Sequence, residues 1–310
     1  MPFYTSTKLI GKQISRVMVD LELLEKIKRI TIIALVSDDV LLEKLVLKGG
    51  NAINLIHKLS SRASIDLDYS MKDDFTPEEY IDIENRIKKA LEAAFKENGY
   101  QIFDFKFYEK PEKVNENVRH FWGGYAVEFK IIESEKYTSF KDIDTLRRHA
   151  VVIGKDNSTK YSIDISKYEF IEEKVGYEID GYTLFAYTPE MIICEKIRAI
   201  CQQVPEYKEI VKSMTPKSRA RDFFDIYTLM THFSVDLTKT ENIELLKNIL
   251  AVKNVPISFL AKISDSKKLH EESYTQLKDT IRSFEKLESF DYYFEFVLKL
   301  TAEILSKIGN

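Results

Sequence analysis

The sequence predicts an α+β protein in which a mixed α/β unit over residues 1–187 precedes a helical bundle over residues 188–310. Two observations lead to this division. Segments with helical and strand periodicity alternate in the first part, whereas nearly every segment after residue 187 repeats with a helical period. The chain has no internal repeat and no Pro/Gly/Ser-rich linker, so the boundary is placed where the periodicity changes.

The elements of the first part are recognised by their local signals. Thr76, Pro77 and Glu79 supply an N-cap, a first-turn proline and a capping-box glutamate for a long amphipathic helix. Period-two alternation, as in Tyr161–Ser166 (YSIDIS), indicates half-buried strands. We therefore expect helices at 20–36, after residue 50 and at 76–96; strands at 44–47, 64–69, 100–108, 124–132, 161–166 and 182–187; and helix starts at Thr188-Pro189 and Thr215-Pro216.

The composition describes a folded and mildly acidic protein. The 310 residues are 44% hydrophobic, enough for a sizeable core, and the formal net charge is -4. The N-terminus has no apolar signal-peptide core, and the longest aliphatic stretch, Ile30–Val36, is far too short to span a bilayer. We therefore expect a soluble cytoplasmic protein without a membrane partner, in which any nucleic-acid contact depends on a local basic surface.

A D-x-D pair is the strongest candidate for chemistry. On a strand, Asp66 and Asp68 would share one face with their carboxylates roughly 7 Å apart. Two such charges resist burial unless a cation joins them, and hard oxygen ligands select Mg²⁺ or Mn²⁺ together with substrate phosphates. Asp164 would complete a two-metal site if its strand lies beside the first. By itself, however, a D-x-D is most often a solvated strand end.

A glycine pair lies upstream of these aspartates. Gly49-Gly50 ends a predicted strand and opens a helix, so its backbone N–H groups can approach a triphosphate without an intervening side chain. A glycine pair alone is most often a turn, but its spacing from Asp66 and Asp68 favours a nucleotide site. The two cysteines, Cys194 and Cys201, are seven residues apart on one helix face, so we expect reduced core thiols and no ordinary zinc site.

Two later helices carry charged residues within apolar faces. Lys196 falls inside an aliphatic arc, whereas Glu195 and Arg198 are expected to point away. Asp222 lies on the core face of the next helix, and Arg221 and Asp225 are expected to form an i,i+4 pair on its outer side. An enclosed lysine requires an anion unless its stem reaches water. Lys196 and Asp222 can therefore form a structural ion pair with each other, or both can face a bound nucleotide.

Together these motifs resemble a known family. The segments Leu47–Gly50 (LKGG) and Arg62–Asp68 (RASIDLD), followed by EKIRA around Lys196 and RARDFFDIYTL around Asp222, resemble the AbiEii/AbiGii toxin family of nucleotidyltransferases. The resemblance spans about residues 45–230, and its motifs occur in the family's order and spacing. It implies a polymerase β-like nucleotidyltransferase fold with a mixed sheet, followed by the helical bundle.

The resemblance also implies roles for individual residues. Asn51 stands where the family usually has a small hydroxyl residue, and its amide can still donate a hydrogen bond to phosphate. The implied assignments are Gly49, Gly50, Asn51 and Ser64 in the nucleotide-phosphate region, Asp66 and Asp68 as the catalytic metal-binding pair, Asp164 as a further metal ligand, and Lys196 and Asp222 as the remaining active-site residues.

The function expected from this resemblance is metal-dependent transfer of a nucleoside monophosphate from an NTP to an acceptor hydroxyl, with Lys196 on the phosphates. The family implies a toxin of a type IV toxin–antitoxin or abortive-infection system, a cognate antitoxin, and an RNA acceptor, since known relatives extend the tRNA acceptor end. A basic cluster offers a surface for RNA phosphates, although most such clusters are simply solvated. It comprises Lys208, Lys212, Lys217, Arg219 and Arg221.

Two other functions are compatible with the same residues. A metal-dependent nuclease also needs clustered carboxylates and a lysine, and it would shorten RNA instead of extending it. A non-catalytic nucleotide- or protein-binding module would recognise a protein partner through the helical bundle, residues 190–310, with a vestigial nucleotide site. Its cellular effect would survive loss of Asp66.

Overall fold

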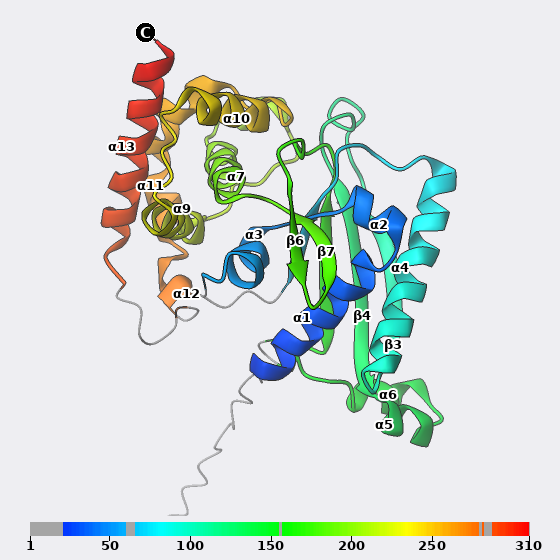
Figure 1. The fold of residues 1–310 in the computed structure, drawn as a ribbon. Helices are drawn as coiled ribbons and strands as arrows, with labels where there is room; N and C mark the ends of the chain where they lie inside the picture. The colour runs from blue at the N-terminus through cyan, green and yellow to red at the C-terminus, as the bar shows by residue number, and fades with distance from the viewer. Residues whose placement is uncertain (1–20, 60–65, 155–156, 279–280, 282–286, 310) are drawn as a thin grey trace, which may run out of the picture.

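A computed structural model of the chain describes residues 21–59, 66–154, 157–278, 281 and 287–309. Ser64, which was expected in the phosphate-binding region, lies outside these ranges. The predicted α+β class is confirmed. A mixed sheet stands between helix α4 on one side and the helices that follow residue 188 on the other (Figure 1). None of the helices in the described ranges is long and apolar enough to cross a membrane.

The sheet has seven strands in the order β3-β4-β5-β2-β1-β7-β6. The central strand β2 pairs in parallel with β5 and antiparallel with β1, and β1 pairs in parallel with β7. Strands separated by about a hundred residues thus lie side by side. The bounds are β1 Val46–Lys48, β2 Leu67–Ser70, β3 Tyr100–Lys110, β4 Gly124–Glu133, β5 Lys160–Ser166, β6 Val175–Ile179 and β7 Tyr182–Ala186.

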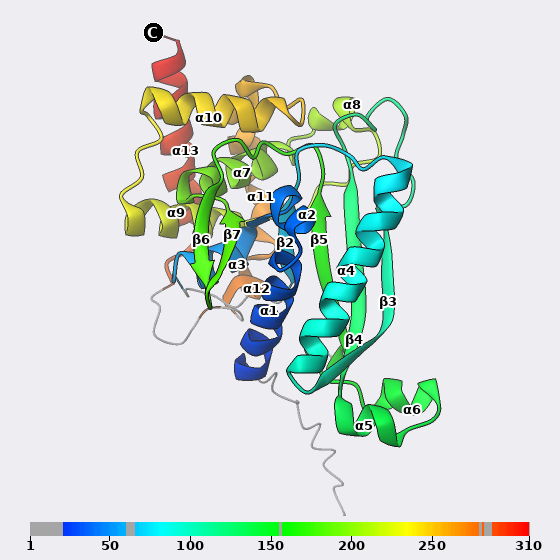
Figure 2. The same ribbon diagram turned by 45° about the vertical axis from the view of Figure 1, so that its right-hand side comes forward.

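Helices α1 (Leu21–Val36) and α4 (Pro77–Glu97) lie together in front of the sheet in Figure 2. The capping box predicted at the start of α4 is present: the Thr76 hydroxyl accepts from the Glu79 N–H at 3.2 Å, and the Glu79 carboxylate accepts from the Thr76 N–H at 2.9 Å. Its buried residues Ile83, Ile87, Leu91 and Phe95 recur at helical spacing. Short segments complete this half: α2 Asp39–Lys44, α3 Gly49–Asn51, the π-helical η1 Ala52–Ile56, α5 Ser134–Ser139 and α6 Ile143–Arg148.

The described residues after 188 form helices that pack on one another, as predicted. Thr188 caps the first of them by accepting from the Met191 N–H at 3.2 Å. The elements are α7 Pro189–Cys201, α8 Tyr207–Ile210, α9 Ala220–Phe233, α10 Thr240–Ala251, the 3₁₀ segment η3 Ile257–Ser266, α11 Lys267–Glu271, α12 Tyr274–Lys278 and α13 Phe290–Ile308. Both cysteines of α7 are free and buried, as predicted.

Two local predictions were wrong, and one strand was not predicted. Thr215-Pro216 does not start a helix: α9 begins at Ala220, and the Lys217 N–H before it donates to the Gln203 side chain at 2.8 Å. Strand β2 begins at Leu67, so Asp66 directly precedes it. Strand β6 was missed because it is an edge strand with mostly exposed side chains, and it therefore lacks the buried alternation that marks the others.

Candidate functional site

Three charged side chains form a row across the centre of the sheet. Lys48 of β1 is the register partner of Asp68 of β2, and Asp68 is the register partner of Asp164 of β5. Directly opposed residues on neighbouring strands project to the same face. The expectation that the strand of Asp164 lies beside that of Asp68 is therefore confirmed, and Lys48 is an additional member of the row.

Position 49, the first residue of α3, accommodates only glycine. Its φ is +67°, and a Cβ built there would lie 2.8 Å from Oδ2 of Asp68. Any side chain would therefore be strained by the backbone conformation and would collide with the carboxylate. The glycine lets the start of α3 approach Asp68 closely, and the buried Gly50 follows within the same turn.

The side-chain amide of Asn51 forms a hydrogen bond within the protein. Its side chain is fully buried, and its Nδ2 donates a hydrogen bond to the backbone oxygen of Asp66. The Oδ1 atom of Asn51 is buried without a hydrogen-bond partner. In this structure the amide therefore anchors the chain at Asp66, which keeps the two aspartates beside α3.

The carboxylates of this region are poorly compensated. Burial raises the pKa of Asp68 to about 6; the negative charges of Asp164, Glu195 and Asp66 add to this shift, and Lys48 opposes it. Burial also raises the pKa of Asp66, followed by the charge of Asp164. The ionised forms of both aspartates are thus disfavoured, and a bound cation would offset this cost.

The ammonium group of Lys110 compensates part of this negative charge. Its ammonium lies 2.8 Å from each carboxylate oxygen of Asp164, and both side chains are partly exposed. Among the residues that the structure describes, no three His, Cys, Asp or Glu side chains lie close enough together to hold a metal ion. Asp66, Asp68 and Asp164 therefore interact electrostatically but do not form a finished metal cage.

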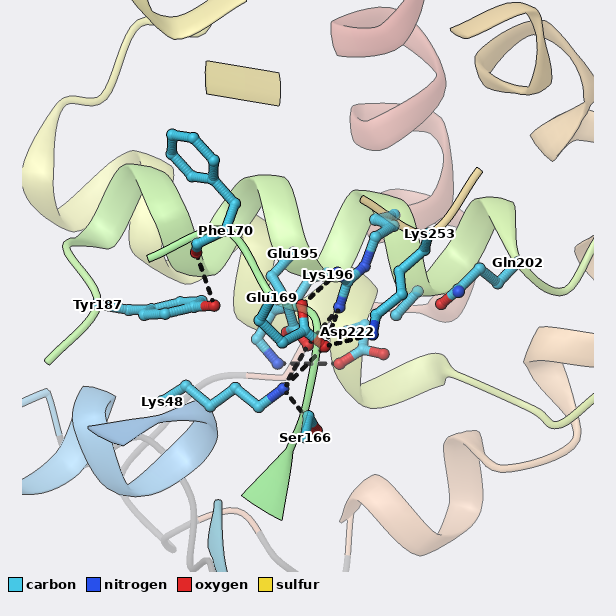
Figure 3. Close-up of polar contacts among 12 residues, drawn as sticks. Lys48, Ser166, Glu169, Phe170, Tyr187, Glu195, Lys196, Gln202, Asp222 and Lys253 are labelled. Atoms are coloured by element: carbon cyan, nitrogen blue, oxygen red, sulfur yellow. Dashed lines mark hydrogen bonds and ion pairs between the residues drawn. The ribbon is translucent and has the colours of Figure 1, made fainter. Parts of the chain in front are cut away.

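A second charged cluster also contains Lys48, and Figure 3 shows its side chains converging on Glu169. Glu169 is at its centre and is almost fully buried. Its contacts are a hydrogen bond from Arg198 Nη1, with Arg198 Nη2 at 3.3 Å, Lys253 Nζ at 3.5 Å and Lys48 Nζ at 3.7 Å. Glu195 completes the cluster, 3.2 Å from Arg198 and 3.4 Å from Lys48. We call these five residues the Glu169 cluster.

Charges in the Glu169 cluster compensate one another. Burial alone would raise the pKa of Glu169, but Arg198, Lys48 and Lys253 hold it well below its usual value. Burial lowers the pKa of Lys253 to about 8 despite the opposing charge of Glu169. Lys253 also donates to two backbone oxygens, of Lys167 at 2.6 Å and of Phe121 at 3.1 Å. The cluster thus fixes α7 and the segment after α10 to the end of β5.

The helical-wheel assignment of α7 was partly wrong. Arg198 was expected to point away from the core, yet it is only 4% exposed, and Glu195 faces Lys48. The reason is that α7 is buried on nearly every side, since it packs against α9 and α10 and also reaches the sheet through Lys48. A helix of this kind has no outer face to assign.

Lys196 forms a separate buried ion cluster. Its ammonium lies 2.9 Å from Asp222 and 2.7 Å from Asp225, and only 5% of the residue is exposed. The Lys196–Asp222 ion pair is therefore present, and the stem of Lys196 does not extend to water. The alternative, that both residues face a bound nucleotide, stays a prediction. The placement of Asp225 on an outer face was wrong, because this carboxylate is buried against Lys196. Asp222 also accepts from Arg219 at 3.3 Å.

A cavity of about 380 Å³ opens beside the row and the Glu169 cluster. Asp164 and Lys110 line one side of it, and Trp122 and Arg219 are also in its lining. Of the predicted site residues, Asp164 alone lines this cavity; Asp66, Asp68, Lys196 and Asp222 do not. Sequence reasoning missed Lys48, Glu169 and Lys253; the Lys48-Gly49-Gly50 run was the one signal that pointed to Lys48.

The arrangement of a carboxylate row against a glycine turn agrees with the family that the sequence matches. A family model described as "Nucleotidyl transferase AbiEii toxin, Type IV TA system" matches residues 33–296. The chain belongs to this family. As a member of the AbiEii family, it is a nucleotidyltransferase toxin of a type IV toxin–antitoxin system. The family implies a nucleotide substrate and an antitoxin partner.

Similar solved structures are distant. A candidate nucleotidyltransferase from H. pylori shares 18% identity with a TM-score of 0.48, over 94% of this chain and 98% of that one. JHP933 from Helicobacter pylori shares 18% identity with a TM-score of 0.49, over 94% and 95%. An antigenic nucleotidyltransferase-like protein from Paracoccidioides brasiliensis shares 14%, with a TM-score of 0.34, over 81% and 94%. No curated protein matches the chain.

Proposed function

We propose that this AbiEii family member transfers a nucleoside monophosphate from an NTP to a hydroxyl of an RNA acceptor, and that it requires Mg²⁺ or Mn²⁺. The observation that carries the proposal is the poor charge compensation of the carboxylates in the row. Asp68 lies between Asp164 and Gly49, whose backbone comes close to the Asp68 carboxylate. Burial and neighbouring negative charge raise the pKa of Asp68 to about 6. A structural ion pair would have lowered that pKa.

The donor set fits a hard divalent cation. Asp66, Asp68 and Asp164 would hold it through carboxylate oxygens, after Lys110 has left Asp164. Mg²⁺ usually takes only one or two protein carboxylates and completes its shell with water and substrate phosphates. The lack of a finished cage among the described residues is therefore compatible with a site that closes around the nucleotide. When bound, the cation would neutralise phosphate charge as it develops during transfer.

The protein's own residues would position the nucleotide. The N–H groups at the start of α3, at Gly49 and Gly50, lie beside Asp68 and can approach the phosphates without an intervening side chain. Lys48, the residue before this turn, carries a buried ammonium that lies at Ser166, Glu169 and Glu195. Because Asp222 and Asp225 already contact Lys196, we assign Lys196 and Asp222 a positioning role: they hold α7 against α9 and orient Arg219 at the cavity.

In the proposed reaction the acceptor hydroxyl attacks the α-phosphorus of the NTP. A phosphorus–oxygen bond forms to the acceptor, the bond between the α-phosphorus and the bridging oxygen breaks, and pyrophosphate leaves with the electron pair of that bond. The hydroxyl proton passes to a nearby carboxylate. Asp164 is the carboxylate of the row that lines the cavity, and an acceptor would enter from there.

The test uses each α-labelled NTP with total RNA, with and without Mg²⁺. The expected product is RNA lengthened by labelled nucleotides in the wild type, and about 10³-fold less of it in Asp68→Asn. The exposed Asp73→Asn variant serves as a matched control because it lies on the chain just after the site but outside the row. RNA that becomes shorter would indicate a nuclease, and a cellular effect that survives Asp66→Ala would indicate a binding module. The same assay on purified tRNA examines whether its acceptor end is the target.

A further inference from the structure

We propose that strand β6 pairs with β6 of a second copy of this chain, which joins two seven-stranded sheets edge to edge. Figure 2 shows β6 at the outer end of the sheet, beyond β7. Among the elements that the structure describes, β7 alone packs extensively against β6. The proposal is independent of the proposed chemistry, because β6 contributes no residue to the carboxylate row.

The backbone of β6 directs hydrogen-bonding groups to the free edge. Ile179 and Tyr182 are register partners on either side of the turn Asp180-Gly181, both of whose residues have positive φ. The residues that flank such a two-residue turn exchange hydrogen bonds, and bonded and non-bonded pairs then alternate along the ladder. Gly176 and Glu178 are therefore in non-bonded pairs, and their N–H and C=O groups point away from β7. Within the described ranges, no backbone group from outside the strand pair bonds to them.

The two edges of the sheet differ in their protection against further pairing. Edge strands are usually blocked by bulges, by proline or by a covering element. At the other edge, the register of β3 shifts between Phe103 and Lys106, and β3 packs against α4. Strand β6 pairs with β7 without such a shift, contains no proline and has glycine at position 176. The edge at β6 can therefore accept another strand.

The side chains along this edge are complementary to those of a second, antiparallel β6. A two-fold axis at Gly176 would place Lys174 opposite Glu178 of the second copy, and Val175 opposite Tyr177 of the second copy. Opposite charges, and pairs of a β-branched with an aromatic residue, both stabilise cross-strand contacts. An axis at Glu178 would instead oppose two like charges, and an axis at Tyr177 would oppose Glu178 to a glycine. The charges therefore select the axis at Gly176.

Both charged groups are placed for this contact. Glu178 is exposed, and none of the described residues forms an ion pair with it. The Lys174 ammonium lies 4.2 Å from the centroid of the Phe185 ring and 3.2 Å from the backbone oxygen of Glu43. Because Phe185 is the register partner of Gly176, this ammonium lies on the face from which Glu178 projects. A surface whose two halves match each other favours a second copy over an unrelated protein.

The first experiment is sedimentation velocity of the full-length protein over a range of concentrations. A strand as short as β6 forms a small interface, so we expect a reversible dimer with a Kd of about 10 µM. A wild-type protein that stays monomeric at about 200 µM, twenty times this Kd, would overturn the inference. Binding of another protein at this edge without self-association would also overturn it.

Variants at Gly176 test whether β6 forms the contact. Gly176→Pro removes the N–H at the free edge and should raise the dimer Kd at least about tenfold, since an edge proline spares the β6–β7 bonds. Gly176→Ala is the matched control, because it keeps this N–H and its Cβ would lie 3.8 Å from Phe185 and Thr183, an ordinary contact. Its Kd should stay within about threefold of wild type. An unchanged dimer in Gly176→Pro would overturn the inference.

Charge reversal tests the register. Glu178→Lys would place two lysines opposite each other in a homodimer, and Lys174→Glu would place two glutamates opposite each other, so each variant alone should be monomeric. An equimolar mixture of the two should form a heterodimer, because every facing pair is again opposite in charge. Lys136→Glu, which reverses an exposed charge on α5, should dimerise like wild type. Circular dichroism checks that each variant is folded. A mixture of folded variants that remains as monomeric as its components would overturn the inference.

Discussion

The carboxylate row and the Glu169 cluster share Lys48, yet their electrostatics are opposite. In the Glu169 cluster, three cations surround one buried carboxylate and hold its pKa far below the usual value. In the row, burial and neighbouring carboxylates raise the pKa of Asp68 to about 6. In the first arrangement the charges compensate one another, whereas in the second we propose that a bound cation supplies the compensation. Two adjacent groups of similar residues can therefore be assigned different roles from their charge balance.

The largest expected effect concerns the row. Asp68→Asn keeps the shape of the side chain but removes the charge that would bind the cation, so nucleotidyl transfer should fall by about 10³-fold. Circular dichroism should show the fold unchanged. Comparable transfer by Asp68→Asn and the exposed Asp73→Asn control would mean that the row is not the site of chemistry.

The next effect concerns the Glu169 cluster. Glu169→Gln leaves Lys48, Arg198 and Lys253 without their shared anion, so the free energy of unfolding should fall by about 3–5 kcal/mol. Urea denaturation measures this change. Glu172→Gln, which removes an exposed partner of Lys72, should stay close to wild type. Equal stability of the two variants would contradict the structural role of the cluster.

Lys196 allows a structural role to be separated from direct action on the nucleotide. Lys196→Met leaves the buried Asp222 and Asp225 without their ammonium, although Arg219 still contacts Asp222, so we expect a loss near the lower end of about 3–5 kcal/mol. Thermal denaturation reports this loss, with the exposed Lys247→Met as the control. A variant of full stability that has lost all transfer would instead place Lys196 on the phosphates.

The pH dependence of the free energy of unfolding tests the cost of ionising Asp68 in the row. Burial raises the pKa of Asp68 in the folded state to about 6, above its ordinary value of 3.8. Its contribution to stability is therefore fully present below about pH 4 and is lost as the pH rises through 6. Without metal, Asp68→Asn should be more stable than wild type by about 1–3 kcal/mol at pH 7.5, with the difference disappearing near pH 4. Urea denaturation in EDTA measures it, and a difference that grows on acidification would refute the assignment.

The smallest effect concerns Lys110. This exposed lysine occupies the carboxylate of Asp164, and an exposed ion pair contributes only about 0.2–1 kcal/mol. Lys110→Met should therefore tighten Mn²⁺ binding by a few-fold at most, as measured by electron paramagnetic resonance of free Mn²⁺. Lys136→Met, which removes a similar exposed pair far from the row, should not change it. Weaker Mn²⁺ binding in Lys110→Met would show that Lys110 supports the cation instead of displacing it.

Much of the fold followed from local signals in the sequence. Thr76 and Thr188 cap helices as expected, since a cap depends on residues within one turn. The sequence did not predict that the strands of Asp68 and Asp164 pair, because periodicity does not specify which strands become neighbours.

The Glu169 cluster was beyond sequence reasoning for a related reason. Glu169 lies in a segment without a motif, and its partners come from β1, α7 and the residues after α10. A helical wheel also assumes one outer face, which α7 lacks, so Arg198 was assigned to solvent. Asp225 was misplaced by the same assumption, because it is buried where α9 meets α7.

The in-register row of Lys48, Asp68 and Asp164 has a consequence for the timing of toxicity. The third member is encoded 96 positions after the second and enters the sheet only when β5 has been synthesised and has paired with β2. A ribosome-bound chain that stops short of β5 lacks part of the row, and one that stops before residue 253 also lacks a cation of the adjoining cluster. Under the proposed function, long-range strand pairing thus delays assembly of the site until more than half of the polypeptide has been made.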